Sequence, residues 1–376
     1  MSNGVRFDAY GPQKVLEVYD PKSGMHGFCV IDNLALGPGK GGIRMTPTVS
    51  IAEVAALART MTWKTAMAEL PFGGAKSGLI ADPRTLSPEK KKGIIQAFAE
   101  ALRGISPESY IAAPDINTAE QEMGWFAEVL GRTSCTGKPK ALGGLPHELG
   151  STGFGVFHAT NVAAEHAGLD LRNARVAIEG FGNVGRFAAK YLAEAGATLA
   201  AVSDSRGVIS NPSGLEFEKL VQAKEEHGSV TMYGSGKVLP NAEIVRLPVD
   251  ILVTAAVPNL IGPGDVDHIK AKLIIEGSNI PTTPDVEAIL HQKKVLVVPD
   301  FVANAGGVIS SYAEWAGKSE ADMFTLVEQK VKKNTRITLE HAKERALTPR
   351  DAALGIARQR VLEKCAFCRI EPPRKK

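Results

Sequence analysis

The sequence predicts an α/β protein of two domains, and three observations lead to this prediction. With 376 residues, the chain exceeds the length at which a single hydrophobic core usually stops growing. Short apolar runs alternate with stretches of helical periodicity along most of the chain, which is the pattern of α/β folds. A connector with glycine and proline, residues 138–149, interrupts the alternation. We therefore expect a first domain over residues 1–150, joined by a carboxyl-terminal helix at about 346–376, a second domain over 151–345, and a cleft between them.

The composition excludes several classes of protein. Apolar residues make up 44% of the chain and charged residues 23%, and the net charge is only +3 without a long basic block, so we expect no nucleic-acid partner. No apolar run approaches about eighteen residues and the amino terminus lacks a signal-peptide core, so we expect no membrane association and a cytoplasmic location. Four cysteines are too few for a disulfide framework. Cys365 and Cys368 have no second pair or histidine at metal spacing, so no metal site is predicted.

The first fifty residues predict two short strands and a turn. Residues 14–19 and 27–31 form the apolar runs of the strands, and the glycine-dense turn at 36–44 carries Lys40 and Arg44. A helix follows over residues 51–69, with Ser50 as its expected N-cap and Lys64 near its end.

Lys76 lies in the run Gly-Gly-Ala-Lys-Ser-Gly, twelve positions after Lys64. The small neighbours let a substrate approach closely and leave the ammonium little solvent, and a second cation nearby disfavours its charge. Both effects predict a lowered pKa, which suits a lysine that polarises a carbonyl or transfers protons. The alternative is a glycine-rich turn with a surface lysine.

Asp115 follows the next predicted strand, residues 110–114, which comes after a helix over 88–102 and before a helix over 120–130. The carboxyl ends of strands are where active sites of α/β proteins gather. Asp115 is therefore the second candidate for a catalytic group.

The second domain begins with a helix over 153–167 and a strand over 175–179. Gly180-Phe-Gly182-Asn-Val-Gly185 comes next, then a helix, and the following strand ends at Asp204. A Gly-x-Gly-x-x-Gly run in this context is the fingerprint of a Rossmann-type dinucleotide-binding domain, with the pyrophosphate at the helix amino terminus. A purely structural glycine turn is the alternative. Asp204 favours NAD through the ribose 2′-hydroxyl, whereas Ser203, Ser205 and Arg206 favour the 2′-phosphate of NADP, so the prediction is NAD or NADP.

Three later strands, residues 250–254, 273–276 and 295–298, each lead into a loop with an asparagine: Asn259, Asn279 and Asn304. We expect these loops to line the nicotinamide side of the cleft, although each asparagine alone is an ordinary turn residue. From Val308 the pattern is helical to about residue 364, with an interruption at Thr348-Pro349.

Six motifs resemble the amino-acid dehydrogenases of the glutamate/leucine/phenylalanine/valine family, in matching order from about residue 10 to about residue 360. They are Lys40-Gly-Gly-Ile-Arg, Trp-Lys64, Pro-Phe-Gly-Gly-Ala-Lys76, Pro-Asp115-Ile-Asn-Thr, Gly-Phe-Gly-Asn-Val-Gly and Asn304-Ala-Gly-Gly-Val308. The resemblance implies reversible oxidative deamination in a homo-oligomer, with a hexamer favoured. Lys64 would bind the α-carboxylate, Lys76 would polarise the carbonyl and activate water, and Asp115 would be the general acid/base, with pKa shifts opposed to those of the lysine.

The resemblance also implies the substrate and the remaining contacts. Lys40 and Ser311 match the positions that hold the side-chain carboxylate in the glutamate enzymes, so L-glutamate is favoured over leucine, valine or phenylalanine, since an aliphatic side chain would leave a buried ammonium unpaired. A catalytically silent nucleotide-binding regulator is the other alternative. The implied substrate contacts are Lys40, Gly41, Met61, Lys64, Val308 and Ser311. The implied coenzyme contacts are Thr152, Gly180, Phe181, Gly182, Asn183, Val184, Gly185, Asp204, Ser205, Arg206, Ala255, Asn259, Asn279 and Asn304.

Overall fold

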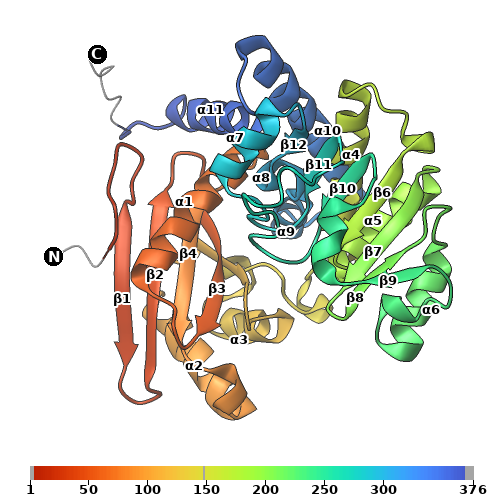
Figure 1. The fold of residues 1–376 in the computed structure, drawn as a ribbon. Helices are drawn as coiled ribbons and strands as arrows, with labels where there is room; N and C mark the ends of the chain where they lie inside the picture. Colours follow the sequence, from red (N-terminus) through yellow and green to blue (C-terminus); the bar gives the residue numbers. More distant parts are fainter. Residues whose placement is uncertain (1–3, 147–148, 369–376) are drawn as a thin grey trace. The chain divides into compact units, whose positions relative to one another are not determined.

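The computed structural model describes residues 4–146 and 149–368, and Figure 1 shows their fold. The chain divides into two compact units, which we describe separately. Unit 1 comprises Met1–Leu149, Val308–Met323 and Ile356–Lys376, and unit 2 comprises Gly150–Gly307 and Phe324–Gly355. In the part of the chain that the structure describes, no helix is long and apolar enough to cross a membrane.

This division departs from the expected domains in two segments. Residues 308–323 belong to unit 1, where the buried carboxylate of Glu314 pairs with Lys138 at 2.5 Å. Residues 346–355 belong to unit 2, where the guanidinium of Arg350 pairs with three carboxylates. Long-range ion pairs of this kind leave no trace in the periodicity of a helix, so the sequence did not reveal them.

The sheet of unit 1 has five strands in the order β1-β2-β4-β3-β5, as Figure 1 shows for its first four strands. The strands β1, β2 and β4 are antiparallel, and β4, β3 and β5 are parallel. In the register of these strands, Ile43 of β3 is paired with Ser77 of β4 and with Pro114 of β5, the residues next to Lys76 and Asp115. The bounds are β1 (Lys14–Asp20), β2 (Met25–Asn33), β3 (Gly39–Thr46), β4 (Gly73–Ile80) and β5 (Tyr110–Pro114).

Three helices cover the two faces of this sheet: α1 (Ile51–Met67), α2 (Pro88–Ala101) and α3 (Glu120–Leu130). The core on one face joins Val30 of β2 to Val54 of α1. The core on the other face joins strand residues such as Ile43 to side chains of α2 and α3. Ser50 caps α1 by accepting a hydrogen bond from the backbone N–H of Glu53 at 3.2 Å, which confirms the predicted N-cap.

The predicted turn at 36–44 is a strand instead, since this segment contributes most of β3. The glycine-rich run around Lys76, for which a turn was the alternative, is the central strand β4. Glycine usually weakens a strand, but it is required where another backbone or helix comes close. A Cβ at Gly74 would lie 2.1 Å from Thr62 Oγ1 of α1, and a Cβ at Gly41 would lie 1.7 Å from the carbonyl oxygen of Ala75. The glycines therefore permit close packing rather than chain reversal.

The sheet of unit 2 has seven strands in the order β12-β11-β10-β6-β7-β8-β9. The strands from β12 to β7 are parallel, and β8 and β9 continue the sheet antiparallel. The strand order reverses between β6 and β10, and ligands of open α/β sheets bind at such a switch point. The bounds are β6 (Arg175–Glu179), β7 (Thr198–Asp204), β8 (Gly207–Ser210), β9 (Lys237–Leu239), β10 (Ile251–Thr254), β11 (Leu273–Glu276) and β12 (Leu296–Val298).

The predicted helix over 153–167 and the helix after the glycine motif are confirmed as α4 (Ser151–His166) and α5 (Asn183–Glu194). The sequence did not predict β8, β9 or the helices α6 (Phe217–His227), α7 (Pro284–Gln292) and α8 (Asp300–Ala303). Short 3₁₀ turns lie at Pro83–Thr85, Arg132–Ser134, Lys140–Leu142, Leu171–Asn173, Val230–Met232 and Asn241–Arg246.

The carboxyl-terminal part is helical, as predicted, in α9 (Gly306–Trp315), α10 (Glu320–Arg345) and α11 (Pro349–Leu362). The interruption at Thr348-Pro349 is confirmed, and a second one at residues 316–319 was not predicted. After α11, Cys365 and Cys368 form a disulfide, a pair for which we predicted no role.

Candidate active site

Lys76 and Asp115, the two residues predicted to be catalytic, face each other in unit 1. Lys76 is on β4 and its side chain is 7% exposed, while Asp115 follows β5 and its side chain is 20% exposed. Lys76 Nζ lies 2.8 Å from Asp115 Oδ1. At this distance a proton can pass between the two groups directly, as general acid–base catalysis requires.

The pKa of Lys76 is lowered, as predicted, but its causes differ in part from those expected. Burial lowers the pKa most, the carboxylate of Asp115 opposes this, and the cation of Arg44 lowers it further; the effect expected from Lys64 stays a prediction. The expectation of opposed shifts is wrong, because the pKa of Asp115 is also lowered. Burial raises the pKa of Asp115, but Lys76 and Arg44 together outweigh burial by stabilising the carboxylate.

Gly42 makes the contact between Lys76 and Asp115 possible. It lies on β3, the strand between those that lead to the two catalytic residues. A Cβ at Gly42 would lie 2.6 Å from the carbonyl oxygen of Pro114 and 2.8 Å from the Cβ of Asp115. Any side chain at this position would displace Asp115, so the glycine is needed for the geometry of the pair.

Lys40, predicted to bind the side-chain carboxylate of the substrate, is almost completely buried in β3, with an exposed fraction of 1%. Its ammonium donates a hydrogen bond of 2.7 Å to the carbonyl oxygen of Ala112. Burial lowers the pKa of Lys40 to about 7. The negative charge of Glu314 raises this pKa, and the positive charges of Lys138 and Lys76 lower it further. Lys40 is thus a buried lysine that can change its charge near neutral pH.

The other predicted substrate contacts also belong to unit 1. Gly41 is next to Lys40 on β3, Met61 and Lys64 lie half-buried on α1, and Val308 and Ser311 lie on α9. Their approach to a substrate stays a prediction.

The glycine motif of unit 2 forms the predicted turn between β6 and α5. Gly180 has a φ of +91°, which disfavours any other residue. A Cβ at Gly185 would lie 1.8 Å from the carbonyl oxygen of Gly180, so this glycine lets the helix pack against the turn. A Cβ at Gly182 would meet nothing within 4 Å. Gly182 is the N-cap of α5, and this open position beside free backbone N–H groups fits a dinucleotide pyrophosphate.

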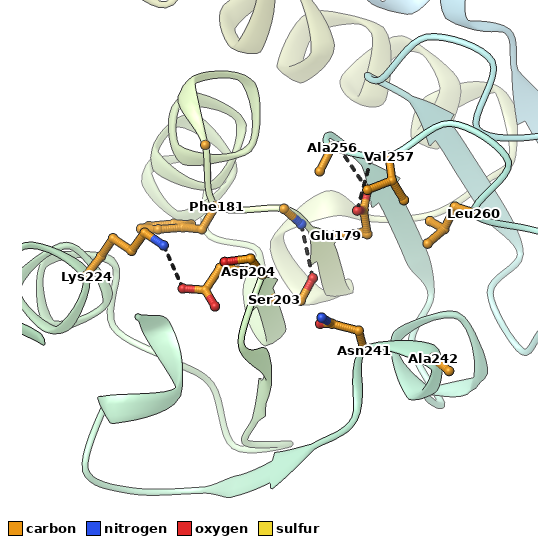
Figure 2. A pocket seen from close by; sticks show the side chains of 13 residues that line it. Glu179, Phe181, Ser203, Asp204, Lys224, Asn241, Ala242, Ala256, Val257 and Leu260 are labelled. Atoms are coloured by element: carbon orange, nitrogen blue, oxygen red, sulfur yellow. Dashed lines mark hydrogen bonds and ion pairs between the residues drawn. The ribbon is translucent and has the colours of Figure 1, made fainter. Parts of the chain in front are cut away.

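A cavity of about 380 Å³ adjoins this turn, and Figure 2 shows the side chains that line it. Five of the predicted coenzyme contacts line the cavity: Gly180, Phe181, Gly182, Asp204 and Ser205. Ser203, considered for the 2′-phosphate, lines it too and accepts a hydrogen bond from the N–H of Gly180. The remaining predicted contacts lie outside its lining: Thr152, Asn183, Val184, Gly185, Arg206, Ala255, Asn259, Asn279 and Asn304.

The sequence analysis missed seven residues that line the cavity: Glu179, Lys224, Asn241, Ala242, Ala256, Val257 and Leu260. Glu179 ends β6, and its carboxylate accepts hydrogen bonds from the backbone N–H groups of residues 255–257. Figure 2 shows Glu179 beside Ala256 and Val257. The sequence could have predicted that the ends of β6 and β10 lie side by side, because a dinucleotide binds where the strand order reverses. The position of Lys224 could not, because it depends on α6.

Asp204 is held on both carboxylate oxygens. Oδ1 accepts from the N–H of Arg206 and from Ser229 Oγ, and Oδ2 accepts from Lys224 Nζ at 2.8 Å and from the N–H of Val230. The lysine contact is visible in Figure 2. The guanidinium of Arg206 instead donates to the carbonyl oxygen of His227 at 3.0 Å. Lys224, and not Arg206, is therefore the cation of this cavity.

The loops with the three asparagines contact one another within unit 2. Asn304 Nδ2 donates to Asn279 Oδ1 at 3.0 Å and to the carbonyl oxygen of Ser278. Asn259 has a φ of +52°, and its N–H donates to the carbonyl oxygen of Ile280. Their role toward a nicotinamide stays a prediction. Among the described residues, no group of three or more His, Cys, Asp or Glu side chains could hold a metal ion.

Comparison with known proteins identifies the family of the chain. A family model described as Glutamate/Leucine/Phenylalanine/Valine dehydrogenase matches residues 143–367, and one described as Glu/Leu/Phe/Val dehydrogenase, dimerisation domain, matches residues 12–131. The chain is 44% identical to a glutamate dehydrogenase of Aeropyrum pernix over 348 residues, which cover 88% of this chain and 83% of the relative. It is 40% identical to an NADP-specific glutamate dehydrogenase of Saccharolobus shibatae over 306 residues, covering 79% and 72%.

The fold is also that of known structures. A hetero-hexameric glutamate dehydrogenase from Thermus thermophilus, solved in a leucine-bound form, matches with a TM-score of 0.84 and 31% identity over 96% of this chain and 91% of that one.

A Rossmann-type unit together with a second unit that buries a lysine–aspartate pair defines a dinucleotide-dependent oxidoreductase. More narrowly, the chain belongs to the glutamate/leucine/phenylalanine/valine dehydrogenase family. It is an amino-acid dehydrogenase, and its coenzyme is NAD or NADP.

Proposed function

We propose that this protein catalyses the reversible oxidative deamination of L-glutamate to 2-oxoglutarate and ammonium. The observation that carries the proposal is the buried pair of Lys76 and Asp115, held 2.8 Å apart on neighbouring parts of one sheet. The relatives named glutamate dehydrogenase, at 44% and 40% identity, support the choice of substrate.

Asp115 acts as the general base. Its lowered pKa keeps it a carboxylate near neutral pH, so it accepts a proton from the ammonium group of glutamate and leaves the amine. A coenzyme bound in unit 2 would supply the hydride acceptor for Cα, and loss of that hydride from the substrate converts the amine to an iminium. Asp115 then returns a proton to the nitrogen as the carbon–nitrogen bond breaks.

Lys76 acts on the carbon. As an ammonium it stabilises negative charge on the oxygen of the carbinolamine that forms when water adds to the iminium. Its lowered pKa also lets it give up a proton more readily than an exposed lysine does. Lys64 binds the α-carboxylate in this proposal and holds Cα in place.

Lys40 and Ser311 select the side chain of the substrate. The ammonium of Lys40 has three donors, one of which is used by the carbonyl oxygen of Ala112. A γ-carboxylate supplies the counter-charge that this buried cation needs. Leucine, valine or phenylalanine supplies none, and a dehydrogenase for these amino acids is the alternative function.

For the coenzyme, the contacts of Asp204 favour NADP. Four protein donors already occupy the two oxygens of this carboxylate, so it is saturated as an acceptor for a ribose 2′-hydroxyl. Lys224 and Ser205 line the same cavity and offer donors to a 2′-phosphate. Assembly into a homo-oligomer, with a hexamer favoured, is proposed from the dimerisation-domain match, and a cytoplasmic location stays a prediction.

The test is a matrix of initial rates of reduced-coenzyme formation with glutamate, leucine, phenylalanine and valine, each with NAD and with NADP. The proposal expects the highest kcat/KM for glutamate with NADP. Leucine or phenylalanine ahead of glutamate would select the alternative substrate class. A higher kcat/KM with NAD would refute the role of Lys224. Absence of activity with all eight pairs would favour a catalytically silent nucleotide-binding regulator.

A further inference from the structure

The side chain of Arg44 lies beside the catalytic pair and has no part in the mechanism above. It is mostly buried, with an exposed fraction of 18%. Its Nε donates to Asp115 Oδ2 at 2.8 Å, and its Nη1 donates to Glu53 Oε1 at 2.6 Å. Glu53, Arg44, Asp115 and Lys76 thus form a line of four alternating charges, closed at its far end by the 2.8 Å contact of Lys76 with Asp115 Oδ1.

This arrangement leaves the carboxylate of Asp115 little freedom to rotate, because each of its oxygens has its own cation. The backbone of Asp115 is also held, since its N–H donates to Thr118 Oγ1, which in turn donates to the carbonyl oxygen of Ile43. A planar guanidinium restrains the direction of a carboxylate more strictly than an ammonium does. Arg44 therefore determines which oxygen faces Lys76.

The fold explains why these residues meet. Ile43 of β3 is paired in register with Pro114 of β5, so Arg44 and Asp115 are the next residues along two neighbouring parallel strands. Glu53 is in the first turn of α1, and its N–H is bound by the capping hydroxyl of Ser50. The cap of α1 thus fixes the carboxylate that holds Arg44.

We propose that Arg44 is a positioning residue for the reaction: it orients the carboxylate of Asp115 toward Lys76, and Glu53 holds Arg44 in the required place. The proposal rests on the function proposed above, in which Asp115 is the acid and base of the reaction.

The charges around Asp115 give this proposal a directional signature. The groups that lower the pKa of Asp115 are Lys76 from β4 and Arg44 from β3; Glu53 from α1 binds Arg44, and the charge of Asp115 acts on the buried phenol of Tyr110 on the preceding strand. Loss of the Arg44 cation removes a group that lowers the pKa of Asp115, so this pKa rises. Loss of the Glu53 anion frees Arg44 from its second partner, so Arg44 stabilises the carboxylate of Asp115 less and the pKa of Asp115 rises to a smaller extent.

The experiment measures kcat and the pH profile of kcat/KM for glutamate oxidation in Arg44→Met, Arg44→Lys, Glu53→Gln and the wild type. Arg103→Met is the matched control, because Arg103 is an exposed arginine of the same unit paired with Glu100. Urea unfolding followed by circular dichroism reports whether each variant is folded, and dissociation constants for the coenzyme report whether the proposed pocket in unit 2 is intact.

For Arg44→Met we expect kcat to fall about 10²-fold, the loss typical of a misplaced catalytic group, and the acidic limb of the profile to move to higher pH. Arg44→Lys keeps the positive charge but lacks the planar guanidinium. Its acidic limb therefore stays near that of the wild type, while its kcat is lower than that of the wild type. Glu53→Gln moves the limb to higher pH by less than Arg44→Met does, with a smaller loss of kcat. The control keeps the wild-type kcat and profile.

An unchanged kcat in Arg44→Met with normal coenzyme binding would overturn the proposal. An acidic limb at the same pH in Arg44→Met and in Arg44→Lys would overturn it as well, because only Arg44→Met removes the positive charge beside Asp115. If Arg44→Met does not fold, Glu53→Gln decides, and a wild-type kcat and limb in that variant would overturn the proposal. A wild type that is inactive with every amino acid would refute the proposed function itself. An active wild type whose kinetics do not change when Arg44 is replaced would refute only the role of Arg44.

Discussion

Replacement of Lys40 by methionine is expected to stabilise the folded protein at low pH and to destabilise it at high pH. Burial lowers the pKa of Lys40 from 10.5 to about 7. Because the unfolded chain binds the proton more tightly than the folded one, the charged lysine opposes folding. This cost is complete below pH 7 and disappears as the pH rises through the window from 7 to 10.5.

The magnitude follows from the size of the shift. One pKa unit corresponds to about 1.4 kcal/mol, so the cost is about 5 kcal/mol at pH 6 and below about 1 kcal/mol at pH 10. Methionine removes this cost, but it also removes the hydrogen bond to the buried carbonyl oxygen of Ala112, at about 1–3 kcal/mol. Lys40→Met should therefore be more stable than the wild type by about 2–4 kcal/mol at pH 6 and less stable by up to about 2 kcal/mol at pH 10.

The assay is urea unfolding of both proteins at equal concentration, followed by circular dichroism at several pH values between 6 and 10. A difference in the free energy of unfolding that does not change with pH would refute the reasoning, because it would show that Lys40 keeps an ordinary pKa in the fold. Lys40→Arg is a useful control, since arginine stays charged throughout and should remain destabilising at pH 10.

Three further predictions concern catalysis, the coenzyme and acid stability. Lys76→Ala and Asp115→Asn should each lower kcat by about 10²–10⁴-fold and leave the dissociation constant of the coenzyme unchanged, so retained turnover in either would remove these roles. Lys224→Met should lower kcat/KM for NADP about tenfold or more and spare NAD, whereas Arg206→Met should leave the ratio unchanged; equal effects on both coenzymes would contradict the NADP proposal. The buried imidazole of His158 has a pKa lowered to about 4 by burial. Since the unfolded chain binds this proton below about pH 6.5, stability should fall from pH 6.5 toward 4, and His158→Phe should flatten that dependence in urea titrations.

The sequence was sufficient for the elements whose signals are local. The N-cap at Ser50, the strand that precedes Asp115 and the Gly180-to-Gly185 turn each follow from a few adjacent residues whose preferences agree with the fold. The prediction failed where glycine serves packing between distant segments. In the sequence, Gly41 and Gly74 resemble turn residues. In the structure, Gly41 packs against the backbone of Ala75 and Gly74 packs against helix α1.

The candidate site shows the same limit. Lys76 and Asp115 could be predicted because motifs surround both of them. The contact of Arg44 with Asp115 depends on the register between β3 and β5, and the contact of Lys224 with Asp204 depends on α6. Neither the register of two strands nor the position of a helix follows from the spacing of residues. The roles of Arg44 and Lys224 are therefore apparent only from the structure.

The electrostatics of unit 1 finally explain how one buried lysine can select a dicarboxylic substrate. The charges of Lys76, Asp115, Arg44 and Glu53 cancel, and so do those of Lys138 and Glu314. The ammonium of Lys40 donates instead to a carbonyl oxygen, and its pKa is about 7. Under the proposed assignment glutamate requires the charged form of Lys40, whereas leucine is compatible with the neutral form.

The ratio of these two forms changes tenfold with each pH unit. Both substrates carry the same α-amino and α-carboxylate groups, so their own titration cancels from the ratio of kcat/KM values. That ratio, glutamate over leucine, should therefore fall by up to about tenfold per pH unit between pH 6.5 and 9, and in Lys40→Met it should not vary with pH. A constant ratio in the wild type would mean that the charge of Lys40 does not face the substrate side chain.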